Sequence, residues 1–278
     1  MTVREALHDM AQALKNTSDA PDLDAQRLLL HVLCHHQPLP CIDTSIHETS
    51  WLFAHSEVFL DPSQEKLLKK LIQRRADGQP LAYILGAQEF YGRSFVVTPD
   101  VLIPRPTTED LIDQALVLID QLSQEKKRSL IVADIGTGSG CIGITLLQER
   151  SEKIEQVVAT DISEKALAVA QKNAAQHKVA DKILFLQGSL LEPLMNKNID
   201  LIVSNPPYVP TSELDDMSGP EKRGLAYEPR IALDGGPTGT PFTAPLATAD
   251  VPVIYETTGG NIDYYNWNKK SPQSSPVD

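Results

Sequence analysis

Between residues 130 and 204 the chain alternates short apolar runs with longer amphipathic segments. The pattern predicts helices at 141–148 and 164–177 and strands at 130–135, 156–161, 183–187 and 199–204. These strands are apolar at nearly every position, which is typical of a parallel sheet with both faces covered. We therefore expect an open α/β sheet, in which ligands bind at the carboxyl ends of the strands.

The first predicted strand ends in a glycine-rich turn, Asp134-Ile135-Gly136-Thr137-Gly138-Ser139-Gly140, which leads directly into a helix. Glycine has no Cβ, so the backbone of this turn can approach a ligand closely. Asp161 ends the second strand, 25 residues after Gly136, where its carboxylate can accept hydrogen bonds from ribose hydroxyls. The spacing differs from the dinucleotide motif G-x-G-x-x-G, and no Gly-Lys-Ser/Thr is present for a triphosphate. S-adenosylmethionine, which has a ribose and an adenine but no phosphate, fits this turn better.

The fourth predicted strand ends in Ser204-Asn205-Pro206-Pro207-Tyr208. Neither proline donates an N–H, so the chain must leave the sheet here along a stiff path. The side-chain oxygen of Asn205 and the carbonyl of Pro206 can accept both hydrogens of a planar NH2 group that lies flat under Tyr208. We interpret this loop as a device that holds an acceptor nitrogen opposite an electrophile, in preference to a coincidental turn.

Residues 1–88 are expected to form a compact helical domain, with helix starts at Pro21-Asp22 and Asp61-Pro62. From residue 89 to 107 the pattern changes to short β-prone runs broken by glycine and proline, which predicts a hairpin that links two domains. The helix from Pro62 carries a basic run, which we interpret as a solvated face, with binding to ribosomal RNA or to an acidic patch of a partner as the alternative. Its members are Lys66, Lys69, Lys70, Arg74 and Arg75.

The composition narrows the class of protein. With 278 residues, 41% of them hydrophobic, the chain is long enough for two domains with buried cores. Its net charge of -12 disfavours binding to a nucleic-acid backbone and favours a protein or small-molecule substrate. Three cysteines, no cationic leader and no apolar run near the roughly 20 residues of a membrane span predict a soluble, cytoplasmic protein. The His and Cys spacing at 31–41 matches no common zinc pattern, so we expect no metal site.

Several stretches together resemble the HemK/PrmC family of peptide chain release factor glutamine methyltransferases. They are Ala82-Tyr83-Ile84-Leu85-Gly86, Glu89-Phe90-Tyr91-Gly92, Val101-Leu102-Ile103-Pro104-Arg105-Pro106, Asp134 through Cys141, Asn205-Pro206-Pro207-Tyr208, Tyr227-Glu228-Pro229-Arg230 and Ala232-Leu233-Asp234-Gly235-Gly236. The resemblance covers residues 1–239. It implies a helical release-factor-binding domain at 1–88, a hairpin linker at 89–107 and a Rossmann-like S-adenosylmethionine-dependent methyltransferase domain at 108–239. The implied reaction methylates the side-chain amide nitrogen (N5) of the glutamine in the Gly-Gly-Gln motif of class I release factors.

The resemblance also implies roles for individual residues. Cofactor contacts fall to Gly136, Thr137, Gly138, Ser139, Gly140, Asp161, Leu190 and Asn205. The catalytic residues would be Asn205, Pro206 and Tyr208, and the substrate glutamine would be bound by Asn205, Pro206, Pro207 and Tyr208. Leu190 stands where the family lines the adenine pocket. The implied partners are class I release factors, with no membrane and no direct nucleic-acid binding.

Two stretches depart from the family pattern. Arg105-Pro106-Thr107-Thr108-Glu109 lacks the first acid of the family's Arg-Pro-Glu-Thr-Glu. Residues 240–278 form an aberrant tail without the family's helix, its Gly-Gly turn into an apolar strand ending near Glu-Ile-Gly, and its final antiparallel strand pair. Val251 to Tyr255 is the one strand-like run there, and Pro252 predicts that it is an edge strand. Our hypothesis is that a frameshift or sequencing error produced this tail and left the fourth strand poorly covered.

Other functions stay open at this point. One is an adenine-N6 or ribosomal RNA guanine-N2 methyltransferase, since the Asn-Pro-Pro-Tyr motif also marks enzymes that act on other planar nitrogens. Another is an inactive member of the family that has lost its C-terminal strands.

Overall fold

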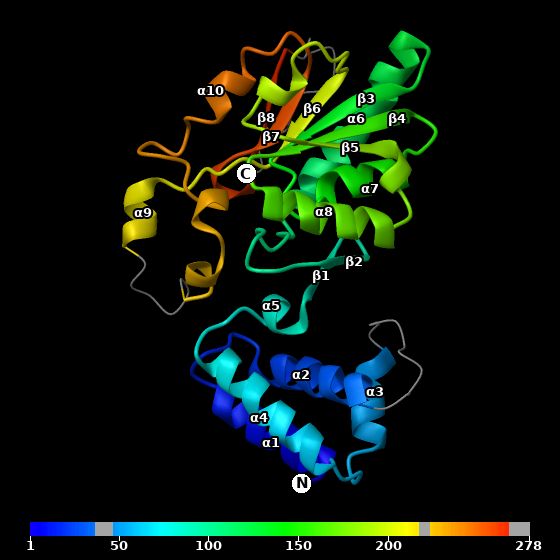
Figure 1. Cartoon of the computed structure of the whole chain (residues 1–278). Coiled ribbons are helices and arrows are strands. Elements are labelled where there is room, and N and C mark those ends of the chain that lie inside the picture. Colours follow the sequence, from blue (N-terminus) through cyan, green and yellow to red (C-terminus); the bar gives the residue numbers. More distant parts are fainter. Residues whose placement is uncertain (37–46, 217–222, 267–278) are drawn as a thin grey trace, which may run out of the picture. The chain divides into compact units, whose positions relative to one another are not determined.

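The computed structural model describes residues 1–36, 47–216 and 223–266. The chain divides into two compact units (Figure 1), each described by itself below. Unit 1 comprises Met1–Gly86 with Ser218–Tyr227, and unit 2 comprises Ala87–Met217 with Glu228–Asp278. The hairpin that the sequence predicted as a linker belongs to unit 2 in this division.

Unit 1 is built from helices, as the sequence predicted. They are α1 (Val3–Leu14), α2 (Pro21–His36), α3 (His47–Ala54), α4 (Pro62–Ala76) and α5 (Leu81–Leu85). Thr2 and Asp61 cap α1 and α4 with side-chain bonds to backbone N–H groups, so both helix starts are fixed by local chemistry. The apolar faces of α1, α2 and α4 meet in one core, in which Leu14, Leu28 and Leu68 are fully buried.

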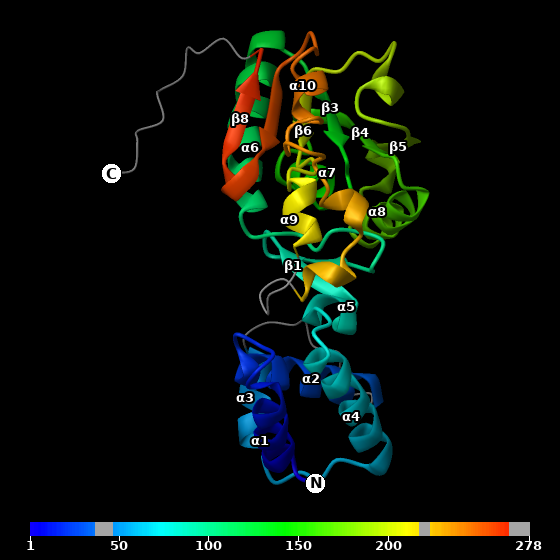
Figure 2. The ribbon, with the colours of Figure 1, turned by 90° about the vertical axis from the view of Figure 1, so that its left-hand side faces the viewer.

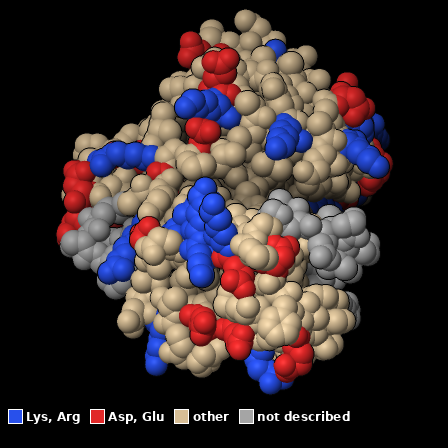
Figure 3. All heavy atoms as spheres, turned by 60° about the horizontal axis from the view of Figure 1, so that its bottom comes forward, with Lys and Arg blue, Asp and Glu red and all other residues tan. Residues whose placement is uncertain are grey.

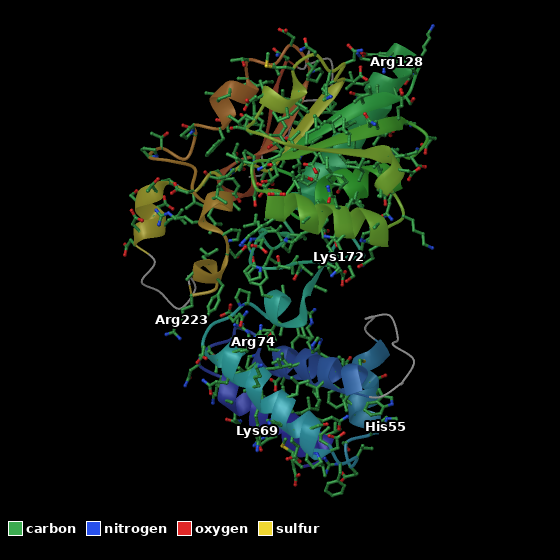
Figure 4. All side chains as sticks on the ribbon, in the orientation of Figure 1. His55, Lys69, Arg74, Arg128, Lys172 and Arg223 are labelled. Atoms are coloured by element: carbon green, nitrogen blue, oxygen red, sulfur yellow. The ribbon has the colours of Figure 1, made fainter. Side chains whose placement is uncertain are left out.

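The basic run on α4 is only partly a free surface. Arg75 donates to Asp24 at 2.7 Å, and Arg74 donates to the side chain of Gln79 at 2.8 Å. Lys69 is exposed, and Figure 4 labels it together with Arg74. Part of the run therefore stabilises unit 1 internally. For the remaining lysines the interpretation as a solvated face, and the alternative of binding to ribosomal RNA or an acidic partner patch, both stay untested.

Unit 2 contains a six-stranded sheet in the order β5-β4-β3-β6-β7-β8. The strands are β3 (Leu130–Ile135), β4 (Ile154–Asp161), β5 (Ile183–Gln187), β6 (Leu201–Ser204), β7 (Val253–Glu256) and β8 (Ile262–Tyr265). All neighbours pair in parallel except β7 and β8, which are antiparallel. The predicted α/β class is confirmed.

Apolar residues cover both faces of this sheet. The helices α6 (Thr108–Lys126), α7 (Cys141–Glu149) and α8 (Glu164–Gln176) share one buried cluster with Leu130 and Val132 of β3. Ala133 and Ile135, which alternate with them along β3, belong to a second cluster with Leu246 of α10 (Thr243–Leu246). Figure 2 shows the same sheet after a 90° turn about the vertical axis from the view of Figure 1. Because both faces are buried, nearly every residue of the central strands is apolar, which is the pattern that the sequence displayed.

The C-terminal segment corrects two expectations. We expected one edge strand at 251–255, but β7 lies inside the sheet between β6 and β8. Pro252 precedes the strand, and its carbonyl accepts a hydrogen bond from the N–H of Ile202 at 2.9 Å, so its missing N–H does not exclude it from this position. The expectation that the fourth predicted strand is poorly covered is also wrong, because β6 pairs with β7 along Ile202 to Ser204. The last part of the predicted tail, 267–278, lies outside the described residues.

The predicted hairpin is formed by β1 (Ala87–Phe90) and β2 (Arg93–Val96). Its two-residue turn has positive φ at both positions, 52° at Tyr91 and 68° at Gly92, which matches the right-handed twist of the strands. The carboxylate of Glu109, at the start of α6, accepts a hydrogen bond from the N–H of Tyr91 at 2.8 Å. Local turn chemistry and a contact from α6 therefore both hold the hairpin in unit 2.

Charged side chains of both signs lie on one face of the molecule. Figure 3 shows Lys and Arg side chains interspersed with Asp and Glu on the face that it draws. Within the described ranges, no helix is both long and apolar enough to cross a bilayer. Of the histidine and cysteine group considered at 31–41, Cys41 and the side chains of His35 and His36 lie outside the described residues.

Candidate active site

A cavity of about 240 Å³ opens in unit 2 at the carboxyl ends of β3, β4 and β6. This is the edge at which an α/β sheet binds ligands. The cavity brings together most of the residues predicted from the sequence, although they come from four separate segments of the chain. Those that line it are Gly136, Thr137, Gly138, Ser139, Asp161, Leu190, Asn205, Pro206 and Pro207.

The glycine-rich turn forms one wall of the cavity. Gly136 and Gly138 have φ angles of 68° and 54°, which side chains other than glycine rarely adopt. A Cβ on Gly136 would meet no protein atom within 4 Å and would occupy the cavity instead. Asp134 anchors the turn from below, because its carboxylate accepts from the hydroxyl of Thr137 at 2.6 Å and from the N–H of Gly143 at 3.0 Å. Burial raises the pKa of Asp134 to about 6.

Gly140 differs from the other glycines of the turn, because it is not among the described residues that line the cavity. Its φ is 81°, and a Cβ there would lie 3.1 Å from Cδ1 of Ile144 and 3.2 Å from Cβ of Ala170. Glycine can adopt this left-handed backbone conformation at the residue before α7. Its lack of a Cβ also allows α7 to pack closely on α8. A cofactor contact at Gly140 stays a prediction, and packing is the role for which the geometry gives a reason.

Asp161 stands at the end of β4, where the sequence predicted it. One carboxylate oxygen accepts from the N–H of Gly138 at 3.0 Å and the other from the N–H of Ser163 at 2.9 Å. Burial raises the pKa of this carboxyl above its usual range, while both backbone bonds oppose the shift. The side chain is thereby fixed at the cavity with lone pairs left for hydroxyl donors. Beside it, the buried hydroxyl of Thr160 has no hydrogen-bond partner among the described residues.

The Asn-Pro-Pro-Tyr loop leaves the end of β6, and its first three residues line another part of the cavity. Ser204 fixes the strand end by donating to the carbonyl of Ile135 at 2.8 Å. The Asn205 side chain donates through Nδ2 to Oγ1 of Thr108 at 3.0 Å. Pro206 and Pro207 also line the cavity, so the predicted acceptor residues lie in the same space as the glycine-rich turn.

Tyr208 has a different position from the one expected. It is not among the described cavity-lining residues, and its hydroxyl donates to Oε1 of Glu256 at 3.2 Å. Burial and the neighbouring Glu256 carboxylate raise the pKa of Tyr208 to about 12, so the phenol stays neutral and remains a donor at ordinary pH. Substrate contact by Tyr208 stays a prediction.

Four side chains that surround this site were not predicted from the sequence. Thr108 and Arg105 line the cavity, and the buried Glu228 accepts from the Arg105 guanidinium and, at 3.0 Å, from the N–H of Ile103. Glu256 reaches the loop from the end of β7. The acids at 228 and 256 lie more than 100 residues after their partners at 103 and 108, and local periodicity carries no signal of such contacts. The one signal for the contact between Arg105 and Glu228 was that both residues lie in stretches that resemble the family, 101–106 and 227–230.

Comparisons with known proteins agree with this arrangement. The family "Methyltransferase small domain" matches residues 108–219, and the family "PrmC N-terminal domain" matches residues 5–86. A release factor glutamine methyltransferase of Geobacter sulfurreducens is 44% identical over 191 residues, which cover 69% of this chain and 62% of that protein. Proteins of the same name from Nitratidesulfovibrio vulgaris and Coxiella burnetii are each 36% identical. Their alignments cover 88% and 86% of this chain and 77% of each relative.

The sheet, the glycine-rich cavity and the match over 108–219 define unit 2 as a methyltransferase domain. In unit 1, residues 5–86 match the PrmC N-terminal domain, and the relative from Nitratidesulfovibrio vulgaris aligns with 88% of this chain. The chain belongs to the family of release factor glutamine methyltransferases. The resemblance predicted from the sequence motifs is confirmed.

Proposed function

We propose that this protein transfers a methyl group from S-adenosylmethionine to N5 of a glutamine side chain, in the Gly-Gly-Gln motif of class I release factors. The observation that carries the proposal is that Asn205 and Pro206 line the same cavity as the glycine-rich turn and Asp161. An acceptor site for a planar NH2 group and a nucleotide-type site therefore adjoin each other. The names of the relatives supply the substrate class.

The residues of the cavity fit the proposed cofactor. The Asp161 carboxylate is held for ribose hydroxyls, and the open space beside Gly136 and Gly138 admits a chain that passes close to the backbone. Leu190, which also lines the cavity, offers an apolar contact for the adenine ring. When bound, S-adenosylmethionine supplies an electrophilic methyl group on a sulfonium. The cavity of about 240 Å³ is smaller than the usual lower bound of small-molecule pockets, about 300 Å³, so the fit rests on the lining residues and not on the volume.

Positioning is the main contribution that these residues make to the reaction. An amide nitrogen is a poor nucleophile because its lone pair is delocalised, so the site must align it rather than activate it with a base. Correct alignment can supply on the order of 7–11 kcal/mol of a reaction barrier. The Asn205 side-chain oxygen and the Pro206 carbonyl accept the two hydrogens of the amide and stabilise the positive charge that grows on nitrogen.

A protein acceptor in the cytoplasm, with no membrane and no direct nucleic-acid binding, completes the proposal. The net charge of -12 fits a partner with a basic surface and opposes a phosphate backbone. Strand β7 pairs with β6, the strand that leads into the Asn-Pro-Pro-Tyr loop. Because the C-terminal segment thus supports this loop, the proposal also holds that the chain is active with that segment as it stands.

The test is a labelled-methyl assay with the full chain and purified release factor. We expect label in the release factor, and none in a release factor whose Gly-Gly-Gln glutamine is replaced by alanine. Asn205→Ala should abolish transfer while only partly weakening cofactor binding in calorimetry. DNA and ribosomal RNA serve as competing acceptors. Label in nucleic acid but not in the release factor would replace this proposal by a nucleic-acid methyltransferase.

A further inference from the structure

We propose that Glu256, acting through Thr108, is a positioning residue that fixes which way the Asn205 side-chain amide faces. The inference rests on the proposed function and deepens it. Glu256 ends β7, in the segment that the sequence analysis took for an aberrant tail. It is fully buried in unit 2, beside the Asn-Pro-Pro-Tyr loop.

Hydroxyl groups converge on the Glu256 carboxylate. Thr108 donates to Oε2 at 2.6 Å, and Tyr208 donates to Oε1 at 3.2 Å. Thr107 makes a longer contact to Oε1, at 3.4 Å. A carboxylate is an acceptor at both oxygens, so the hydroxyls of Thr108 and Tyr208 must each point their proton toward it.

The direction of the Thr108 bond determines the state of its oxygen. A threonine hydroxyl has one proton and two lone pairs. Because the proton is committed to Glu256, Oγ1 of Thr108 can only accept from any further neighbour. That neighbour is the Asn205 side chain, at 3.0 Å.

An oxygen that can only accept selects one of the two orientations of an asparagine amide. Nδ2 of Asn205 must face Thr108, and Oδ1 must face away from it. Oδ1 is thereby kept as an acceptor, and Asn205 lines the cavity with Pro206. In the opposite orientation the amide would present N–H groups to the substrate nitrogen, which also carries hydrogens, and the two would repel. Glu256 thus sets the polarity of a hydrogen-bond chain that ends at the acceptor site.

A buried carboxylate at this position destabilises the fold unless its charge serves to hold hydrogen-bond donors. Burying an ionised carboxyl is strongly unfavourable unless hydrogen bonds compensate. Among the contacts of the described residues, the partners of Glu256 are hydroxyls, and no ion pair involves it. A glutamine would fill the same space without the charge, but it would offer one acceptor and one donor. It could therefore reverse the direction of the Thr108 hydroxyl.

The adjacent threonines provide matched variants. Thr107 and Thr108 both contact Glu256, but the Asn205 side chain donates to Thr108. Thr108→Val removes the relay, Thr108→Ser keeps the hydroxyl, and Thr107→Val is the control. Glu256→Gln keeps the shape of the carboxylate and changes its hydrogen-bond character.

The first readout is steady-state methylation of purified release factor, with kcat and KM measured separately. We expect kcat to fall about ten- to hundredfold in Thr108→Val and Glu256→Gln, the effect of losing one hydrogen bond to a charged group. KM for release factor should change less than about twofold, because both side chains are buried and act on the substrate through Asn205. Thr108→Ser should recover most of kcat, and Thr107→Val should stay within about twofold of the parent.

The second readout does not need activity. The Asn205 side-chain NH2 should give slowly exchanging resonances in nitrogen-15 spectra of the parent protein, and this protection should be lost in Thr108→Val and regained in Thr108→Ser. Glu256→Gln or Thr108→Val with kcat within twofold of the parent would overturn the inference, as would an unprotected Asn205 amide in the parent. If the parent protein fails to methylate any glutamine, the proposed function fails, and the amide protection still decides the inference.

Discussion

Asn173 connects three parts of unit 2, and its replacement by alanine is the most informative structural perturbation. This fully buried residue of α8 accepts at Oδ1 from the N–H of Val96 at 2.7 Å. Its Nδ2 donates to the carbonyls of Val96 at 3.0 Å and Ser139 at 2.8 Å. One side chain therefore joins the hairpin strand β2 to the glycine-rich turn. Asn173→Ala removes all three bonds and leaves the backbone groups in place.

The loss of unfolding free energy in Asn173→Ala can be calculated from these three hydrogen bonds. A buried polar group that loses its partner costs about 1–3 kcal/mol, and the figure is lower where water can replace the partner. The half-buried Val96 groups belong at the lower end and the buried carbonyl of Ser139 at the upper end, which gives about 3–5 kcal/mol in total. Alanine has the higher helix propensity and restores about 0.7 kcal/mol. We expect a net loss of about 3 kcal/mol.

Hydrogen exchange is the appropriate assay, because a chain of two units does not give a single unfolding transition. A loss of about 3 kcal/mol corresponds to roughly hundredfold faster exchange of the amides of the buried central strand β3, whose hydrogen bonds the variant keeps and whose exchange requires opening of unit 2. Lys172→Ala changes the exposed neighbour on the same helix, which Figure 4 labels, and should shift stability by less than about 0.5 kcal/mol. Less than about threefold acceleration in Asn173→Ala would refute the reasoning.

Three further predictions concern buried groups of unit 2. Thr145→Val should stabilise unit 2 by about 1 kcal/mol in hydrogen exchange of its core amides, because the buried Thr145 hydroxyl has no partner among the described residues; a loss of stability would contradict this. Glu228→Ala should cost about 1–3 kcal/mol in the same exchange measurement, because it leaves the N–H of Ile103 without its acceptor, while the 32% exposed Arg105 side chain can be solvated by water; an unchanged stability would contradict this. Asp134 has a folded pKa of about 6, above its unfolded value of 3.8, so the unfolding free energy should fall by on the order of 3 kcal/mol as pH rises through that window. Asp134→Asn should remove this fall, and an unchanged pH profile in the variant would count against a buried acid there.

Local patterns in the sequence predicted the elements that are stabilised locally. The starts of α2 and α4 follow from Pro21 and from the Asp61 cap, and β3 spans the predicted residues, 130–135. The cavity followed from the glycine-rich turn and from Asp161, because parallel strands bring their carboxyl ends to one edge.

Long-range contacts explain what the sequence did not predict. Strand β7 was expected at an edge because Pro252 was counted as part of the strand, and β8 was not expected at all. Its residues Ile262 to Tyr265 include exposed positions, so an antiparallel edge strand leaves little apolar signal. Asn173 and Glu256 are polar residues whose partners lie 77 and 148 residues away, which no local window contains.

The central claim is that the cavity holds a glutamine amide for methylation, and peptide mass spectrometry tests it most directly. Purified release factor would be incubated with the full chain and S-adenosylmethionine, and the peptide containing Gly-Gly-Gln would be fragmented. We predict a single added methyl group on the glutamine side-chain nitrogen, absent with Asn205→Ala. An unmodified peptide, or a methyl group on another residue, would contradict the account.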